Sequence, residues 1–406
     1  MNPLICSSFR LRRILVMLTA IFVTVVSTHA QTLTVLHTFT SRPDGLTPIG
    51  GVIMDGFGRL LGTTAQGGTG TQGTVFMIDA SGNETVLHSF VNRPDGLDPE
   101  AGLVIDEFNN LYGTTELGGS QGKGTIFMVT PGGLMETVLH SFTCCPPLGK
   151  NPVAGLIFDA AGNLYGTAQN GGDQAQDGTV FKLGSPGVLN ELTALHVFNA
   201  RAGDGRNPRG RLFFDHLGNL YGTTYQGGTQ DQGTVFEIDN AGNYSVIYSF
   251  GSNVGIADGK WPRAGVIRDQ FGNLYGTTSK GGEFNGGTVF IIPEDGTGEF
   301  VVHSFGAPGD GQWPYGGLAI DADGNLYGTT VAGGAAQQGT VFTIAPAGDN
   351  SFSYAVLHSF NGNDGASPAA GVIVGPDGNL YGTCSQGGPG NGFHGTGGTV
   401  WKLSLH

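Results

Sequence analysis

The sequence has little charge, very little positive charge and few cysteines. Charged side chains make up 12% of the 406 residues, and 18 basic residues stand against 32 acidic ones, which gives a net charge of −14. A surface of this sign repels phosphate backbones and argues against a nucleic-acid partner. Three of the four cysteines lie after the first thirty residues, and an odd number with two of them adjacent, Cys144 and Cys145, does not indicate a disulfide framework. After the first thirty residues no apolar run is long enough to span a membrane.

The first thirty residues have the pattern of a secretory signal peptide. Arg10, Arg12 and Arg13 precede an apolar run, Ile14 to Val26, and Thr28 to Ala30 form a small-residue cleavage pattern. We therefore expect a signal peptide at 1–30, cleavage near Ala30, and a secreted, extracellular or periplasmic protein. The alternative is an uncleaved N-terminal anchor.

Glycine is abundant, and it recurs at fixed offsets. The chain has 74 glycines, and many belong to seven copies of Gly-Asn-Leu-Tyr-Gly-Thr-Thr or a close variant. Successive copies start about 51 to 56 residues apart, a period typical of propeller blades. The copies are Gly58–Thr64, Asn109–Thr115, Gly162–Ala168, Gly218–Thr224, Gly272–Thr278, Gly324–Thr330 and Gly378–Cys384.

Each repeat is interpreted as four short strands, A to D. In the fourth repeat these are Arg211–Asp215, Leu220–Thr224, Thr234–Ile238 and Tyr244–Phe250. Runs of β-branched and aromatic residues between Gly, Asn and Asp are typical of antiparallel strands joined by tight turns. Because small Ala and Gly residues open strand A, we expect this strand nearest to a crowded central axis.

The ends of the chain predict how the ring closes. Strand D comes first, at Leu33–Phe39, and strand C comes last, at Thr399–Leu403. The N-terminal strand would then complete the last blade (1+3 closure). The predicted fold is all-β, a seven-bladed β-propeller of four-stranded antiparallel blades forming one domain at 31–406. The predicted blades are 49–90, 99–142, 152–198, 208–250, 262–305, 314–360, and 368–403 with 33–39.

These repeated motifs resemble the GloVer (Gloeo/Verruco) tandem repeat of secreted bacterial proteins. Asn-Leu-Tyr-Gly-Thr-Thr, Gly-Thr-Val-Phe and Leu-His-Ser-Phe recur in fixed order over residues 33–403. The resemblance implies an exported repeat protein with no established activity. Family members often carry a C-terminal surface anchor, whereas this chain ends at Leu405-His406 directly after strand C, so we expect free secretion.

Histidine recurs on strand D, and Tyr248 takes the seventh position. Histidine suggests acid–base catalysis or metal binding, but equivalent residues on different blades lie too far apart to form one site. We interpret them as structural residues that bond to a Thr or Asp of the same blade. They are His37, His88, His140, His196, His303 and His358.

Aspartates recur in two kinds of turn. One set precedes six of the seven A–B turns, where Asp accepts backbone N–H bonds. Another lies in an Asp-Gly-x-x-Pro loop between strands D and A. Asp321-Ala-Asp323-Gly-Asn325 is faintly similar to a calcium loop but lacks its closing Glu. We expect no metal and no cofactor.

Function should lie where the sevenfold pattern breaks, and the D–A loops of the fourth to sixth repeats break it. The D–A and B–C loops should emerge on one face. There, aromatic and cationic side chains suit stacking on a sugar or peptide; alternatively, each Trp packs on its own loop. The candidate ligand-binding residues are Arg206, Arg209, Lys260, Trp261, Arg263, Trp313 and Tyr315.

Two further irregularities are the long last B–C loop, Gln386–Gly397 with His394, and the segment Thr143–Gly149, where the Asp-Gly signal is lost. We interpret the first as flexible and the second as a tolerated change. A bridge from Cys384 to Cys144 or Cys145 stays open.

We expect a monomeric, non-catalytic scaffold that binds an extracellular glycan or peptide, with no catalytic residues assigned. The alternatives are a lyase or lactonase type of enzyme in the central channel, and a structural envelope protein. For an enzyme the sequence offers only Arg211 and Arg268 on strand A, and Glu100 and His394 in loops.

Overall fold

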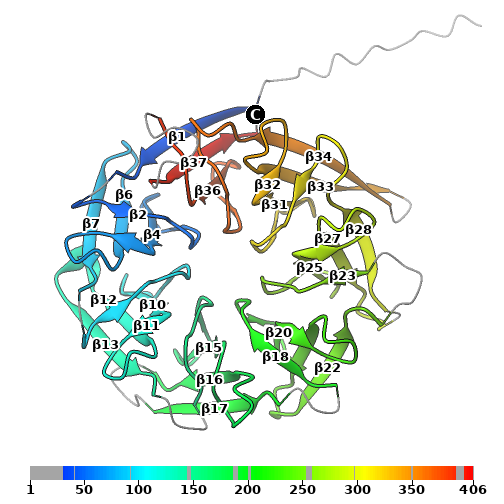
Figure 1. The fold of residues 1–406 in the computed structure, drawn as a ribbon, viewed down its shortest axis with the longest axis horizontal. Helices are drawn as coiled ribbons and strands as arrows, with labels where there is room; N and C mark the ends of the chain where they lie inside the picture. Colours follow the sequence, from blue (N-terminus) through cyan, green and yellow to red (C-terminus); the bar gives the residue numbers. More distant parts are fainter. Residues whose placement is uncertain are drawn as a thin grey trace, which may run out of the picture. The chain divides into compact units, whose positions relative to one another are not determined.

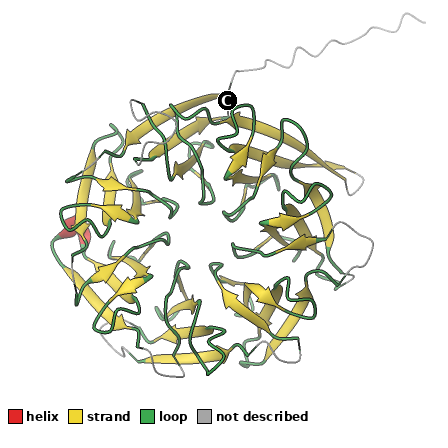
Figure 2. Cartoon of the chain, in the orientation of Figure 1, coloured by secondary structure: helices red, strands yellow, loops and turns green. Residues whose placement is uncertain are grey.

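The computed structural model has seven small antiparallel sheets arranged in a ring (Figure 1), and residues of all seven line a cavity at its centre. The structure describes residues 31–40, 42–91, 93–143, 148–185, 191–199, 203–252, 258–296, 298–348, 351–389 and 397–405. The predicted signal peptide at 1–30, Cys144, Cys145 and His394 lie outside these residues. Within them, no helix is long and apolar enough to cross a membrane. Figure 2 shows strands joined by loops, and one short 3-10 helix, η1 (Pro131–Gly133).

Each blade has the four predicted strands in the order A-B-C-D. The first four blades are β3 (Ile53–Met54), β4 (Leu60–Thr64), β6 (Thr74–Ile78), β7 (Glu84–Ser89); β9 (Val104–Ile105), β10 (Leu111–Thr115), β12 (Thr125–Val129), β13 (Glu136–Ser141); β14 (Ile157–Phe158), β15 (Leu164–Ala168), β16 (Thr179–Leu183), β17 (Leu192–Val197); and β19 (Phe213–Phe214), β20 (Leu220–Gly227), β21 (Thr234–Ile238), β22 (Tyr244–Ser249). The other three are β24 (Ile267–Arg268), β25 (Leu274–Thr278), β27 (Thr288–Ile292), β28 (Phe300–Ser304); β30 (Ala319–Ile320), β31 (Leu326–Thr330), β33 (Thr340–Gly348), β34 (Ser351–Ser359); and β35 (Ile373–Val374), β36 (Leu380–Cys384), β37 (Thr399–Ser404) with β1 (Thr32–Thr38).

The N-terminal strand completes the last blade. Strand β1 pairs antiparallel with β37, from Thr32 opposite Ser404 to Thr38 opposite Thr399. In Figure 1 the blue β1 lies beside the red β37. A side-chain bond also joins the two ends of the ring, because the Thr383 hydroxyl donates to the carbonyl of Gly50 at 3.1 Å. The predicted order of strands at the closure agrees with this pairing.

Seven hydrophobic clusters hold the ring together, one between each pair of adjacent blades. The glycine inside Leu-Tyr-Gly-Thr-Thr makes this packing feasible. A Cβ on Gly222 would lie 2.4 Å from the ring of Phe236 on the neighbouring strand C, and that ring is fully buried. The two repeated motifs are thus two halves of one contact, which explains why they recur together.

On one face, the D–A and B–C loops pair with each other, which the sequence analysis did not predict. These pairs are β2 (Gly45–Leu46) with β5 (Gln66–Gly67), β8 (Gly96–Leu97) with β11 (Leu117–Gly118), β18 (Gly205–Pro208) with β20, β23 (Gly259–Lys260) with β26 (Lys280–Gly281), and β29 (Gly311–Gln312) with β32 (Ala332–Gly333). We call these pairs ribbons. They are formed by backbone hydrogen bonds, and their glycine-rich sequences are therefore typical of loops. They place both loops on the same face.

Candidate functional site

Three equivalent positions in each blade surround one mouth of the channel. We call them the loop position, two residues after the loop glycine; the post-proline position; and the strand-end position, just after the Thr-Thr of strand B. A backbone bond ties the first to the third, for example from Glu116 N to Asp98 O at 3.0 Å and from Val331 N to Trp313 O at 3.1 Å. The fold therefore fixes their places, and only the side chains differ.

The post-proline residues line the channel at this mouth. With the strand A residues they enclose a cavity of about 560 Å³. Going round the ring, they are Ile49, Glu100, Val153, Arg209, Arg263, Tyr315 and Ala369. Charge therefore enters the cavity from the second, fourth and fifth blades only.

Deeper in the channel, six blades carry glycine and one carries arginine. The six glycines are Gly51, Gly102, Gly155, Gly265, Gly317 and Gly371. Arg211 of the fourth blade takes the seventh place; its Nε donates to the Leu156 carbonyl at 3.2 Å. Burial by the channel wall lowers the pKa of Arg211, although the side chain keeps surface open to the channel.

Blades four to six gather cations and aromatic rings at the mouth, and we call this group the basic–aromatic sector. The Arg263 guanidinium lies 4.1 Å from the ring centre of Tyr315 and 5.3 Å from that of Tyr225. Arg209 lies over the same Tyr225 ring at 4.9 Å, and Tyr225 is 6.0 Å from Trp261. Stacked cations of this kind are held by the ring quadrupoles.

The two loop tryptophans, Trp261 and Trp313, adopt a backbone conformation that is unfavourable for large side chains. The loop position has positive φ in all seven blades, and the other five residues there are Thr47, Asp98, Asn151, Asn207 and Ser367. Trp261 and Trp313 adopt φ of 57° and 61°, a left-handed region unusual for bulky side chains. The backbone conformation that the propeller imposes at this position therefore does not explain why tryptophan occurs there. Backbone strain of this kind is often found at functional sites.

The structure brings together some of the predicted ligand-binding residues and separates others. Arg209, Arg263 and Tyr315 line the cavity, and Trp261 contacts them through Tyr225. The Lys280 ammonium lies 4.2 Å from the ring centre of Trp313.

Arg206 and Lys260 lie on the small ribbons β18 and β23, outside the cavity lining. Arg206 makes a two-bond ion pair with Asp231, with an Nη2–Oδ2 distance of 2.6 Å.

Four residues at this mouth were not predicted from the sequence: Tyr225, Lys280, and Asp98 and Glu116, the acidic neighbours of Glu100 on blade two. Aligning the residue after Thr-Thr in all repeats would have found two of them, since Tyr225 and Glu116 stand where other blades have Ala65, Gln169, Ser279, Val331 and Ser385. Nothing in one repeat alone marks that position, because it lies between a strand and a loop.

Blade two forms an acidic sector at the same mouth. The carboxylate oxygens of Asp98, Glu100 and Glu116 all lie within 4.8 Å of one another. Burial, followed by repulsion from its two acidic neighbours, raises the pKa of Glu100 to about 7. The charges of Arg209 and Arg263 act against this rise. Three oxygens of this type could ligate a hard cation, but would leave most of its coordination to other donors.

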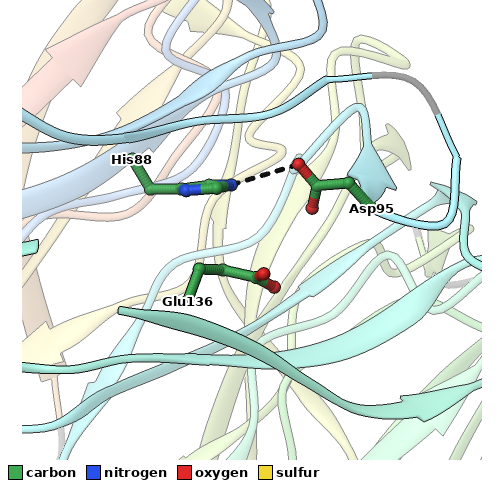
Figure 3. Close-up of side chains that lie close together, drawn as sticks. All are labelled: His88, Asp95 and Glu136. Atoms are coloured by element: carbon green, nitrogen blue, oxygen red, sulfur yellow. Dashed lines mark hydrogen bonds and ion pairs between the residues drawn. The ribbon is translucent and has the colours of Figure 1, made fainter. Parts of the chain in front are cut away.

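A second group of titratable side chains lies in the seams between blades. His88 donates or accepts a bond with Asp95 at 3.2 Å, and Glu136 of the next blade points toward the same aspartate (Figure 3). Burial, followed by repulsion from Asp95, raises the pKa of Glu136 to about 7. In another seam Tyr244 stacks on His196 at 3.6 Å and donates to Asp204 at 2.6 Å.

These seams give the repeated histidines a structural role. Five of the six bond an aspartate of the following D–A loop rather than a Thr of their own sheet; they are His37, His88, His196, His303 and His358. In the third seam Leu148 replaces the aspartate and Leu192 replaces the Glu or Tyr. There the buried Nε2 of His140 has no hydrogen-bond partner in the described part of the chain.

The turn aspartates are also satisfied locally. Asp321 accepts from the backbone N–H of Asp323 and Asn325, from the Asn325 side chain, and from the Tyr327 hydroxyl.

At the end of strand B in the last blade, Cys384 is a buried free cysteine.

Comparison with known proteins identifies the repeat. The family model of the Gloeobacter/Verrucomicrobia repeat matches residues 22–156, 106–318 and 256–406, which confirms the predicted family. No curated protein matches the sequence.

Solved structures are similar in fold. The extracellular domain of a candidate one-component system from B. thetaiotaomicron has a TM-score of 0.56 at 10% identity; the match covers 91% of this chain and 40% of that one. A candidate 6-phosphogluconolactonase from Bacteroides uniformis has a TM-score of 0.52 at 17% identity, covering 80% of this chain and 88% of that one. At such identities the likeness shows the fold alone.

Proposed function

The chain belongs to the Gloeobacter/Verrucomicrobia repeat family, and we propose that it is a secreted, non-catalytic binding protein. Its ligand, an extracellular glycan or peptide, docks on the face made by the D–A and B–C loops. The observation that carries this proposal is the basic–aromatic sector, in which three adjacent blades place Arg, Tyr and Trp at positions that carry no cationic or aromatic side chain in the other four blades.

The tryptophans support a ligand more than a packing role. Both are half-buried and both hold a left-handed backbone that Asn adopts more readily in the equivalent place on two other blades. Aromatic side chains with nearby donors suit the faces of sugar rings and the side chains of peptides. A cavity of about 560 Å³ beside them is within the range of ligand pockets.

A binding screen with position-matched variants tests the proposal. The mature protein is applied to glycan and peptide arrays together with Trp261→Asn and Trp313→Asn, which keep a residue suited to positive φ. Thr47→Asn is the control, because it makes the same change at the equivalent position of the first blade. We expect specific binding that both tryptophan variants weaken by about tenfold or more and the control retains.

Unchanged binding in both tryptophan variants would contradict the proposed face. If nothing binds and a broad substrate panel is not turned over, a structural envelope protein is the remaining interpretation.

A channel enzyme is the second candidate, favoured by one observation. Glu100 combines a pKa of about 7 with a place in the cavity opposite two guanidinium groups, which suits a general acid or base. Turnover of lactones or uronic-acid polymers that Glu100→Gln abolishes would establish it. Turnover that this variant retains would eliminate Glu100 as the acid or base.

A further inference from the structure

Three arginines from two adjacent blades reach the channel cavity without an acidic partner. In the described residues, neither Arg209 nor Arg263 has a hydrogen bond or an ion pair, and the Nε of each is buried. Arg211, below them, has only its Nε bond to a backbone carbonyl. Burial and the neighbouring charge of Arg263 lower the pKa of Arg209, so the cations repel each other.

Arginines without an ion pair are unusual in a protein with 32 acidic and 18 basic residues. Arg268, on strand A of the fifth blade, is also well buried, and it pairs with both Asp215 and Glu294 at 3.0 Å. Buried guanidinium groups are normally compensated in this way, because an isolated buried charge is strongly unfavourable. In the described part of the chain Arg209 and Arg263 have no such ion pair, and Glu100 and Glu116 act on Arg209 only through electrostatic attraction across the cavity. Arg211 is exposed to the channel.

On these grounds, and resting on the proposed binding function, we infer that the channel mouth binds the carboxylate of an acidic sugar, such as a uronate unit of a glycan. Arg209 and Arg263 hold the carboxylate, with Arg211 below it in the channel. Guanidinium groups match carboxylates with paired, charge-assisted hydrogen bonds. The neighbouring units of the glycan then extend toward the tryptophans.

The opposite wall favours a singly charged sugar over a doubly charged sugar phosphate. Glu100, with Asp98 and Glu116 beside it, presents carboxyl oxygens that can accept bonds from sugar hydroxyls. The same oxygens repel additional negative charge. A carboxylate with hydroxyl groups around it therefore fits both walls, whereas a doubly charged group fits only the arginine side.

A matched pair of ligands provides the main test, because it needs no variant. Isothermal titration of the mature protein compares a trisaccharide that carries a single galacturonate unit with its methyl ester, which has the same rings without the charge. We expect the ester to bind at least about tenfold more weakly. Trigalactose and a galactose phosphate are run beside them, and both should be weaker than the uronate.

Variants then locate the site. Arg209→Gln and Arg263→Gln should each reduce uronate affinity about tenfold or more, whereas Arg59→Gln, which removes an arginine from an A–B turn of the first blade, should not. Thermal unfolding confirms that each variant is folded.

Equal binding of acid and ester, tighter binding of the phosphate, or insensitivity to both arginine changes would overturn the inference. If neutral glycans or peptides bind and only the tryptophan variants weaken them, the proposed face is retained and the acidic-sugar inference is wrong. If no ligand binds at all, both proposals fail.

Discussion

The seams between blades and the mouth of the channel are both formed by repeated positions. The residue types at these positions are nearly constant in the seams and vary from blade to blade at the mouth. In the seams a His or Tyr of strand D bonds the aspartate of the next loop in six places. At the mouth, each of the three equivalent positions carries acid, base, aromatic or small side chains depending on the blade. Uniform contacts thus hold the ring, and non-uniform ones are available for recognition.

This contrast separates stability from binding. Residues of the seams and of the cores between blades should change the free energy of unfolding when replaced. Residues of the mouth should change binding and leave stability nearly unaltered. Four measurements test the separation, beginning with the largest effect.

The core between blades should give the largest loss of stability. Phe236→Ala removes a fully buried ring that packs against Gly222, and we expect it to lower the free energy of unfolding by about 3–5 kcal/mol. Chemical denaturation measures the change. Phe271→Ala, at a ring that is 71% exposed in an A–B turn, should stay within about 0.5 kcal/mol; equal losses in both would contradict the packing.

The seams should make stability depend on pH. Burial, followed by repulsion from Asp258, raises the pKa of Glu299 from 4.5 to about 8. The folded protein therefore keeps a proton that the unfolded chain releases, so stability falls as pH rises from about 4.5 to 8, by up to about 1.4 kcal/mol per unit. Aspartates with lowered pKa, such as Asp204, act in the opposite sense only in more acidic solution.

Denaturation at pH 5, 6, 7 and 8 tests this slope. Glu299→Gln should reduce the slope and stabilise the protein at pH 8, while Glu136 and Glu100 continue to contribute to it. Glu107→Gln, at an exposed turn residue, should leave the slope unchanged. An identical slope in wild type and Glu299→Gln would show that Glu299 ionises normally.

The mouth should tolerate substitution better than the seams do. Trp261→Asn replaces an indole at φ 57° with a residue that accepts this conformation. We expect the free energy of unfolding to change by less than about 1 kcal/mol, while ligand binding is lost. A destabilisation as large as that of Phe236→Ala would mean that Trp261 is a packing residue, and the comparison between mouth and core would no longer hold.

The smallest effect concerns the pH dependence of binding. Glu100, which faces Arg209 and Arg263 and lies beside Asp98 and Glu116, has a pKa of about 7. Its protonated form does not repel a carboxylate ligand, so uronate affinity should fall severalfold from pH 6 to pH 8. Titration of Glu100→Gln should give nearly constant affinity over this range. A slope that remains in the variant would assign the dependence to another group.

Much of the fold could be predicted from the repeat alone. The spacing of Leu-Tyr-Gly-Thr-Thr and Gly-Thr-Val-Phe predicts seven four-stranded blades, and the phase of the ends predicts that β1 pairs with β37. The blades are predicted correctly because their strands are neighbours in the sequence at nearly constant separation. The pairing at the closure is predicted because the chain begins with strand D and ends with strand C.

The candidate site could be predicted only in part. Arg209, Arg263 and Tyr315 follow a proline in the D–A loop, and the expectation that this face differs between blades identified them. That Arg206 instead pairs with Asp231 depends on a neighbouring B–C loop and could not be predicted from its own loop. Tyr225 and Glu116 were missed for the same reason, since they matter only through the side chains they meet.

The repeat is enough to predict the all-β class, the number of blades and the strand order, because the strands of one blade are close in sequence and pair with one another. Which side chains share a cavity depends on how the blades are arranged in space. Closing seven blades into a ring brings the loops of blades two, four and five to one channel mouth. It thereby places Glu100 opposite Arg209 and Arg263, residues more than a hundred positions apart.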